Sequence, residues 1–202
     1  MGLPHSYNLL SPIYDLAVAK GTHKHRKKSL EKTSLNDEDT VLISGIGSGL
    51  DIPLLKTGAD YYGIDLTPSM LRRALHKKQS QNLNIHLQQG NVMCLPYQDN
   101  CFNVIIMHLI LAVVPDPART LQEAQRTLKP GGKIIILDKF LQPGQLAPIR
   151  KLLNPIISRL ATRLDVVFEE VLSQCNQLQL IENTPADRTG WFRHIILQKT
   201  RL

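Results

Sequence analysis

Apolar and polar positions along this chain follow two alternating patterns. Short apolar runs bounded by glycine, proline or charged residues predict β-strands, and amphipathic stretches between them predict helices. The predicted strands cover residues 41–44, 61–65, 85–88, 102–108 and 134–138. The predicted helices begin near residue 51, cover 67–78 and cover 117–128, where Lys129-Pro130-Gly131-Gly132 is expected to stop the last one. Strands alternating with helices indicate a parallel sheet with helices on both faces.

The two ends of the chain carry different patterns. Residues 7–20 predict one or two short amphipathic helices broken near Pro12, and a basic segment continues as a helix to about Leu35. Between 146 and 164 apolar residues recur at helical spacing among arginine and lysine residues, with a kink expected at Pro155. Two final apolar runs, 178–181 and 192–197, predict strands that complete the sheet. We therefore expect one domain over residues 1–202, with a helical cap (1–35), a ligand-binding core (40–140) and an acceptor-side helix followed by the last strands (141–202).

The composition is typical of a globular protein. The chain has 202 residues, of which 43% are hydrophobic. The longest apolar stretch, 104–114, contains His108 and is too short to span a bilayer. The N-terminus lacks the order of a signal peptide, and three cysteines without metal-site spacing predict no metal site and a reduced, cytoplasmic protein.

Positive charge is concentrated in one segment. The net charge is +7, and residues 20–32 contain six lysine or arginine residues opposed only by Glu31. Such a cluster fits nucleic acid, an anionic membrane, an acidic partner or simply a solvated helix face. Aromatic residues make up only 5% and do not interleave with the cluster, so nucleic acid is an unlikely partner.

A glycine-rich loop is the strongest chemical feature. Val41 to Gly49 reads Val-Leu-Ile-Ser-Gly-Ile-Gly-Ser-Gly, and Asp65 closes the next predicted strand. Glycines let a backbone approach a ligand closely, and an acid at the next strand end can accept ribose hydroxyls, which indicates an adenosine-containing ligand. A dinucleotide loop would have its third glycine at Leu50, and Asp51 would repel a pyrophosphate.

The polar residues at the ends of the other predicted strands extend this site. The fold is expected to gather them on one rim of the sheet, beyond the carboxyl ends of the strands. They are Gly45, Asp65, Asn91, His108 and Asp138.

Several short segments of the sequence resemble the motifs of the class I S-adenosylmethionine (SAM) methyltransferases related to ubiquinone and menaquinone C-methyltransferases. The similarity covers roughly residues 40–140 and rests on four blocks in order: 41–49, 62–71, 90–104 and 128–132. It implies a Rossmann-like, seven-stranded, mostly parallel α/β sheet, SAM as cofactor and S-adenosylhomocysteine as product. A narrower set of blocks resembles the small bacterial phosphatidylethanolamine N-methyltransferases. These are Ser11-Pro12-Ile13-Tyr14-Asp15, Met107-His108 followed by 113–117, Asp138-Lys139-Phe140 and Leu146-Ala147-Pro148.

The resemblance also implies roles for single residues. Gly45 and Gly47 would line the methionine end of SAM, Asp65 would hold the ribose, and Leu66 would pack on the adenine. Asn91 and Val92 would meet the adenine edge, Met107 and His108 would offer backbone contacts, and Tyr14 would cover the cofactor. The implied cofactor-binding set is Tyr14, Gly45, Ile46, Gly47, Gly49, Asp65, Leu66, Met70, Asn91, Val92, Met107 and His108.

Three positions depart from the pattern of this family. Many relatives have acids where Ile43, Asn91 and Asn103 stand. The changes leave the pocket intact, but they keep a non-catalytic SAM-binding protein among the alternatives.

Chemistry and acceptor are less defined by the sequence. An amine nucleophile must be neutral to attack, so His108 is the first candidate base and Tyr14 the second; both also fit a packing role. The stripe at 146–164 fits either a helix lying on an anionic membrane or one closing the substrate pocket. The expected acceptor is a phospholipid amine, with a quinone or another small molecule as the alternative. A lipid acceptor would place the protein at the inner membrane face, and the oligomeric state is not predicted.

Overall fold

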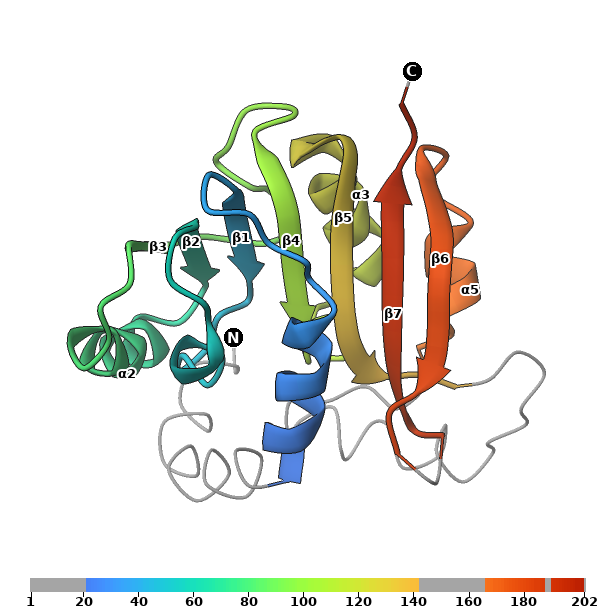
Figure 1. Ribbon diagram of the computed structural model, residues 1–202. Coiled ribbons are helices and arrows are strands. Elements are labelled where there is room, and N and C mark those ends of the chain that lie inside the picture. Colours follow the sequence, from blue (N-terminus) through green and yellow to red (C-terminus); the bar gives the residue numbers. More distant parts are fainter. Residues whose placement is uncertain (1–20, 142–165, 188–189, 202) are drawn as a thin grey trace, which may run out of the picture.

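A single seven-stranded sheet forms the centre of the molecule, in the order β3-β2-β1-β4-β5-β7-β6 (Figure 1). The computed structural model describes residues 21–141, 166–187 and 190–201. The strands are β1 (Thr40–Ser44), β2 (Asp60–Asp65), β3 (Ile85–Gln89), β4 (Phe102–His108), β5 (Leu128–Lys139), β6 (Leu178–Pro185) and β7 (Phe192–Lys199). The expected mostly parallel α/β sheet is therefore confirmed.

Strand pairing brings the carboxyl ends of the parallel strands, and so the predicted rim residues, to the same end of the sheet. β1 to β5 run parallel, with Ser44 beside Ile64, Asp65 beside Gln89 and His108 beside Leu137. β7 runs antiparallel between β5 and β6. The strand order reverses at β1, which pairs with β2 on one side and β4 on the other, and a ligand crevice is expected at such a reversal.

Helices cover both faces of the sheet. They are a helix over residues 21–31, the 3₁₀ turn η1 (Ile52–Leu54), α2 (Pro68–Gln79), α3 (Pro117–Thr127) and α5 (Phe168–Leu172). Figure 1 shows the 21–31 helix crossing one face, near the carboxyl ends of β4 and β5, with α3 and α5 on the opposite side. None of the helices in the described ranges is long and apolar enough to cross a membrane.

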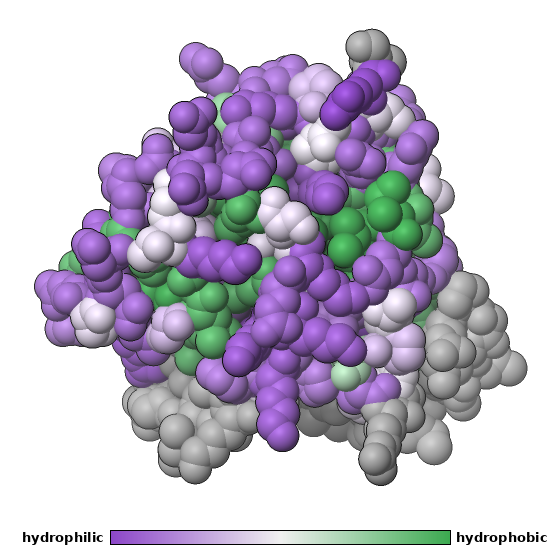
Figure 2. Space-filling view, in the orientation of Figure 1, coloured by the Kyte–Doolittle hydropathy of each residue, from purple (hydrophilic) through white to green (hydrophobic). Residues whose placement is uncertain are grey.

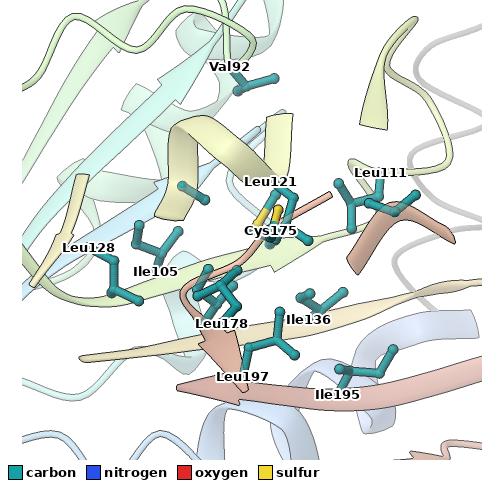
Figure 3. Packing of buried hydrophobic residues seen from close by; sticks show 14 of the residues in the cluster. Val92, Ile105, Leu111, Leu121, Leu128, Ile136, Cys175, Leu178, Ile195 and Leu197 are labelled. Atoms are coloured by element: carbon teal, nitrogen blue, oxygen red, sulfur yellow. The ribbon is translucent and has the colours of Figure 1, made fainter. Parts of the chain in front are cut away.

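The hydrophobic core consists of two layers separated by the sheet. One layer joins α3 and α5 to β4, β5 and β7, and Figure 3 shows Leu121 and Cys175 among its members. The other joins Leu30 of the 21–31 helix, Ile52 of η1 and Ala74 of α2 to the opposite face of β1, β2 and β4. Strands buried on both faces explain why their sequences are nearly continuous apolar runs.

The structure differs from the predicted element boundaries at several places, and β6 extends beyond the predicted 178–181 to Pro185. The basic helix ends at residue 31, not near 35. The helix expected from Asp51 is only η1, and Asp51 makes no side-chain cap to it because its carboxylate binds elsewhere. Lys129-Pro130-Gly131-Gly132 does not separate helix from strand. β5 starts at Leu128, and these residues form an irregularity within it, with Leu128 paired to Phe102 and Lys133 to Val104.

Several predictions fall outside the described residues. These are the helices expected within 7–20, Tyr14, the Ser11–Asp15 block, the 146–164 stripe with Pro155, and the Leu146-Ala147-Pro148 block.

His194 is a buried imidazole on β7, between Leu137 of β5 and Thr184 of β6. It is 1% exposed, and neither ring nitrogen has a hydrogen-bond partner in the part of the chain that the structure describes. Burial, reinforced by the charges of Lys32 and Lys28, lowers the pKa of His194 to about 4. The folded protein therefore favours the neutral ring.

This burial predicts a pH-dependent stability. His194 becomes protonated near pH 6.5 in the unfolded chain but only near pH 4 in the folded chain. The free energy of unfolding should therefore fall by about 3 kcal/mol as pH drops between these values. Urea unfolding at a series of pH values measures this slope. His194→Leu should flatten it, and the exposed His76→Leu should not; equal slopes in both variants would contradict the assignment.

Candidate functional site

The loop after β1 folds back over the end of β2. The amides of Gly45 and Ile46 both donate to the carbonyl oxygen of Ile64, at 2.9 Å each. Gly45, Gly47 and Gly49 have φ angles of +75°, +55° and +75°, in the left-handed region that favours glycine. The alternate glycines of the sequence are therefore required by the shape of the loop.

The space around the three glycines differs. A Cβ on Gly45 would lie 2.5 Å from Ile110 Cδ1, and one on Gly49 would lie 2.9 Å from the Ala74 Cα. A Cβ on Gly47 would meet nothing within 4 Å. Gly45 and Gly49 therefore serve internal packing, whereas Gly47 borders open space where a ligand can approach the backbone.

Asp65 connects this loop to the end of β2. Its carboxylate accepts hydrogen bonds from the amides of Gly47 (2.8 Å) and Thr67 (2.9 Å). Burial raises the pKa of Asp65, and these two backbone donors partly oppose the rise. Leu66, the next residue, is 65% exposed. A carboxylate beside an uncovered apolar side chain suits a ribose joined to a flat base.

The structure places the other predicted cofactor residues at different depths. Asn91 is exposed, and its side-chain oxygen accepts from the Met93 amide at 2.9 Å, with a second lone pair left for a ligand. Val92 and Met107 have buried side chains within the core, so only their backbones can serve a ligand. The side chains of Ile46 and Met70 are buried as well.

A buried charged network lies where the loop meets β4 and the 21–31 helix. Arg26 Nη1 lies 2.9 Å from both carboxylate oxygens of Asp51. One of these oxygens also lies 2.9 Å from His108 Nδ1, and His108 Nε2 lies 2.9 Å from Ser29 Oγ. Arg26 Nε donates to Thr22 Oγ1 at 3.1 Å. Three segments distant in sequence thus meet in one chain of hydrogen bonds.

Asp51 is ionised in this network. Burial alone would raise the pKa of its carboxyl group, but the positive charge of Arg26 and the contact with His108 outweigh burial and hold the pKa well below its usual range. The sequence indicated Asp51 only as the start of a helix and as a poor neighbour for a pyrophosphate. The roles of Arg26 and Ser29 went unnoticed, although Thr22, Arg26, Ser29 and Thr33 stand at helical spacing on the buried face of a basic segment.

Asp138 closes the same rim at the end of β5. Its buried carboxylate accepts from the amides of Ala112 (3.1 Å) and Lys139 (2.8 Å). Burial raises the pKa of Asp138 to about 6 against the effect of these donors. The carboxylate fixes the segment after β4, which also carries Ile110 over Gly45.

The departures from the family pattern have structural explanations. Ile43 is buried in the core layer beneath the 21–31 helix. Asn103 lies at the start of β4, at the opposite edge from the loop, where its oxygen accepts from Thr40 N and Lys129 Nζ. Asn103 therefore holds the sheet together and is not part of the rim.

The comparisons with known proteins agree with this geometry. A family profile described as "Methyltransferase domain" matches residues 42–136. A 2-phytyl-1,4-naphtoquinone methyltransferase of Trichormus variabilis is 32% identical over 177 residues, covering 81% of this chain and 76% of that protein. The chain belongs to the SAM-dependent methyltransferases. It is also 28% identical to a phosphatidylethanolamine N-methyltransferase of Cereibacter sphaeroides over 190 residues, which is 93% of each protein.

Solved structures show the same fold for this methyltransferase. A geranyl diphosphate methyltransferase in complex with SAM has a TM-score of 0.73 at 14% identity, over 89% of this chain and 85% of that one. A putative methyltransferase in complex with the Haloferax volcanii Trm112 activator has a TM-score of 0.72 at 17% identity, over 92% and 95%. The fold is that of the class I enzymes, and SAM is the cofactor.

The residues present fit SAM without a phosphate cradle. Gly47 borders open space, and its amide donates to the Asp65 carboxylate. Leu66, which follows Asp65 at the end of β2, has an exposed side chain. The buried hydroxyl of Ser44, directly before the loop, has no hydrogen-bond partner within the described ranges and can serve a ligand. SAM supplies a methyl group activated by its sulfonium, and these residues would orient it.

Alanine at two of the loop glycines separates cofactor contact from folding. Gly47→Ala should cost only about 1–2 kcal/mol of stability for its left-handed backbone, but should weaken S-adenosylhomocysteine binding at least about tenfold, because the new methyl group enters the open space. Gly49→Ala should destabilise more, because its Cβ collides with the α2 backbone. Calorimetric titration and thermal unfolding measure the two effects. Normal affinity in Gly47→Ala would show that the cofactor lies elsewhere.

The Arg26–Asp51 pair predicts a large stability effect. Arg26→Met leaves the Asp51 carboxylate buried with only His108 as a partner, which should reduce the free energy of unfolding by about 3–5 kcal/mol. Arg26→Met/Asp51→Asn should recover part of this loss, since the uncompensated charge is gone. Urea unfolding compares the variants with the exposed Lys27→Met. If Arg26→Met lowered the free energy of unfolding as little as Lys27→Met does, water would have to reach the Arg26–Asp51 ion pair.

Proposed function

We propose that this methyltransferase transfers a methyl group from SAM to the amine of phosphatidylethanolamine. The observation that carries the proposal is the similarity to the Cereibacter sphaeroides phosphatidylethanolamine N-methyltransferase over 93% of both proteins, which includes the regions on either side of the cofactor core. A quinone acceptor is the alternative, because the naphtoquinone methyltransferase relative is similar over 81% of this chain.

The outer face of the 21–31 helix supports a lipid acceptor. Thr22, Arg26, Ser29 and Leu30 are buried, whereas His23, Lys24, Lys27 and Lys28 are exposed. Figure 2 shows hydrophilic side chains over this part of the surface. Each lysine near an anionic bilayer contributes about 1 kcal/mol of attraction. Because the exposed face is charged and not apolar, the helix would lie against lipid headgroups without entering the bilayer, at the inner face of the membrane.

The reaction needs orientation more than chemical activation. The sulfonium already makes the methyl group electrophilic, and holding nucleophile, methyl and sulfur in line is worth about 7–11 kcal/mol. The amine must also lose a proton before it attacks. His108, at the end of β4, is the base that we propose first, and Tyr14 is the second.

An acceptor panel tests the proposed substrate. Purified protein is incubated with methyl-labelled SAM and one of three acceptors: dioleoyl phosphatidylethanolamine in vesicles with phosphatidylglycerol, demethylmenaquinol kept reduced with dithionite, or bulk RNA. Label should enter the phosphatidylethanolamine. Transfer to demethylmenaquinol alone would replace the proposal with the quinone alternative.

The charged helix face is tested separately. The variant Lys24→Gln/Lys27→Gln/Lys28→Gln should bind phosphatidylglycerol vesicles at least about tenfold more weakly at low salt, because it loses three exposed charges. Sedimentation with vesicles measures the binding. The control Lys56→Gln/Arg72→Gln/Arg201→Gln removes as many exposed charges elsewhere and should bind nearly as the parent does. Equal losses in both variants would show that only net charge matters.

A further inference from the structure

The segment after β3 carries the residues expected at the adenine edge, and β2 fixes where this segment begins. The amide of Gly90 donates to the Asp65 carbonyl oxygen at 3.0 Å, so the chain leaves β3 beside the residue expected to hold the ribose. A tight turn follows, in which the Cys94 amide donates to the Asn91 carbonyl oxygen at 3.0 Å. Asn91 therefore lies close to the end of β2.

The rest of the segment is held by side chains of α3. Glu123 Oε2 accepts a hydrogen bond from the Leu95 amide at 2.8 Å. Arg126 donates to the carbonyl oxygens of Leu95, at 3.0 Å, and Tyr97, at 2.8 Å. Arg119, further toward the start of α3, donates from Nε to the Met93 carbonyl oxygen at 3.2 Å. One helix thus holds the backbone of the segment at three residues.

Glu123 and Arg126 also depend on each other. Arg126 Nη2 lies 2.8 Å from Glu123 Oε2, and Glu123 is only 5% exposed. Burial would raise the pKa of the Glu123 carboxyl group, but the hydrogen bonds from Arg126 and the Leu95 amide hold it below its ordinary value. Arg126 also reaches Asp99, whose exposed carboxylate adds little because water screens it.

These contacts bear on the hydrogen-bonding groups of the turn. The Asn91 side-chain oxygen accepts from the Met93 amide at 2.9 Å and keeps a second lone pair for a ligand. The backbone amide of Val92 can donate. An acceptor beside a donor matches the amino-bearing edge of adenine, whereas a purine with an oxygen in place of the amine presents the opposite pattern. The match requires that both groups stay in place, and the turn is fixed by Gly90 before it and by α3 after it.

We propose that Arg126 and Glu123 are positioning residues for the adenine end of SAM. They hold the segment from Met93 to Tyr97, and through it they place Asn91 and Val92 so that the site selects the amino-bearing base. Neither side chain has to touch the cofactor. The proposal rests on SAM as the cofactor and not on the acceptor proposed above, and its test needs no acceptor.

Base selectivity measures this placement. The probes are S-adenosylhomocysteine and S-inosylhomocysteine, which differ only in the amine or oxygen on the base. Calorimetric titration of the parent should show S-adenosylhomocysteine bound at least about tenfold more tightly, because Asn91 accepts from its amine. Arg126→Met should weaken S-adenosylhomocysteine about tenfold and S-inosylhomocysteine less than about twofold, so the selectivity nearly disappears.

Two controls separate placement from stability. Asn91→Ala should lose the same selectivity, because it removes the acceptor itself. Gln125→Ala changes the same helix at a residue that accepts from the Gln177 amide at 3.0 Å and not from the segment after β3. It should lower the unfolding temperature by a few degrees and leave the selectivity unchanged.

A second variant covers the case in which Arg126→Met does not fold. Arg126→Lys keeps a positive charge beside Glu123, but its ammonium group lacks the fork that reaches both the Leu95 and Tyr97 carbonyl oxygens, so its selectivity should lie between those of the parent and Asn91→Ala. Parent selectivity in the Arg126 variants would reduce the network to a brace for the fold. A parent that does not discriminate between the probes, or an equal loss in Gln125→Ala, would also overturn the proposal.

Discussion

One buried carboxylate joins the parts of this methyltransferase that the chain keeps apart in sequence. Asp51 directly follows the cofactor loop, and its two oxygens bind Arg26 of the 21–31 helix and His108 of β4. Because a buried charge is costly without partners, the helix cannot leave this position without exposing or stranding an ion. The loop, the helix and the strand end are therefore held in one arrangement, and the site depends on it.

The candidate cofactor site consists mostly of backbone. Left-handed glycines shape the loop, Asp65 secures it through the Gly47 amide, and the one open position is at Gly47 itself. Such a site orients a ligand through fixed amides and shape and needs few side chains. This suits methyl transfer, where the sulfonium carries the reactivity and the protein contributes geometry.

Buried titratable groups gather at the carboxyl end of β5 and the adjoining part of β7. Asp138 has a pKa raised to about 6, while His194, on the same face as the 21–31 helix, has a pKa lowered to about 4. Burial is the main cause of both shifts, since each group stays closer to neutral when water is excluded. Perturbed groups of this kind collect at functional sites more often than elsewhere. Asp138 and His194 lie at neighbouring positions of the paired strands β5 and β7 and are candidates for the functional site.

The sequence by itself determined the sheet, its parallel core, the glycine loop and the acid at Asp65, because each depends on local periodicity or on a backbone angle that only glycine adopts easily. It indicated His108 at a strand end but not its partners. Only the tertiary structure decided that Asp51 turns away from its helix to join Arg26 and His108, and that Ser29 Oγ lies within hydrogen-bonding distance of the imidazole. These contacts span 25 to 79 residues, and no local pattern encodes them. They form because a folded chain must pair every charge that it buries.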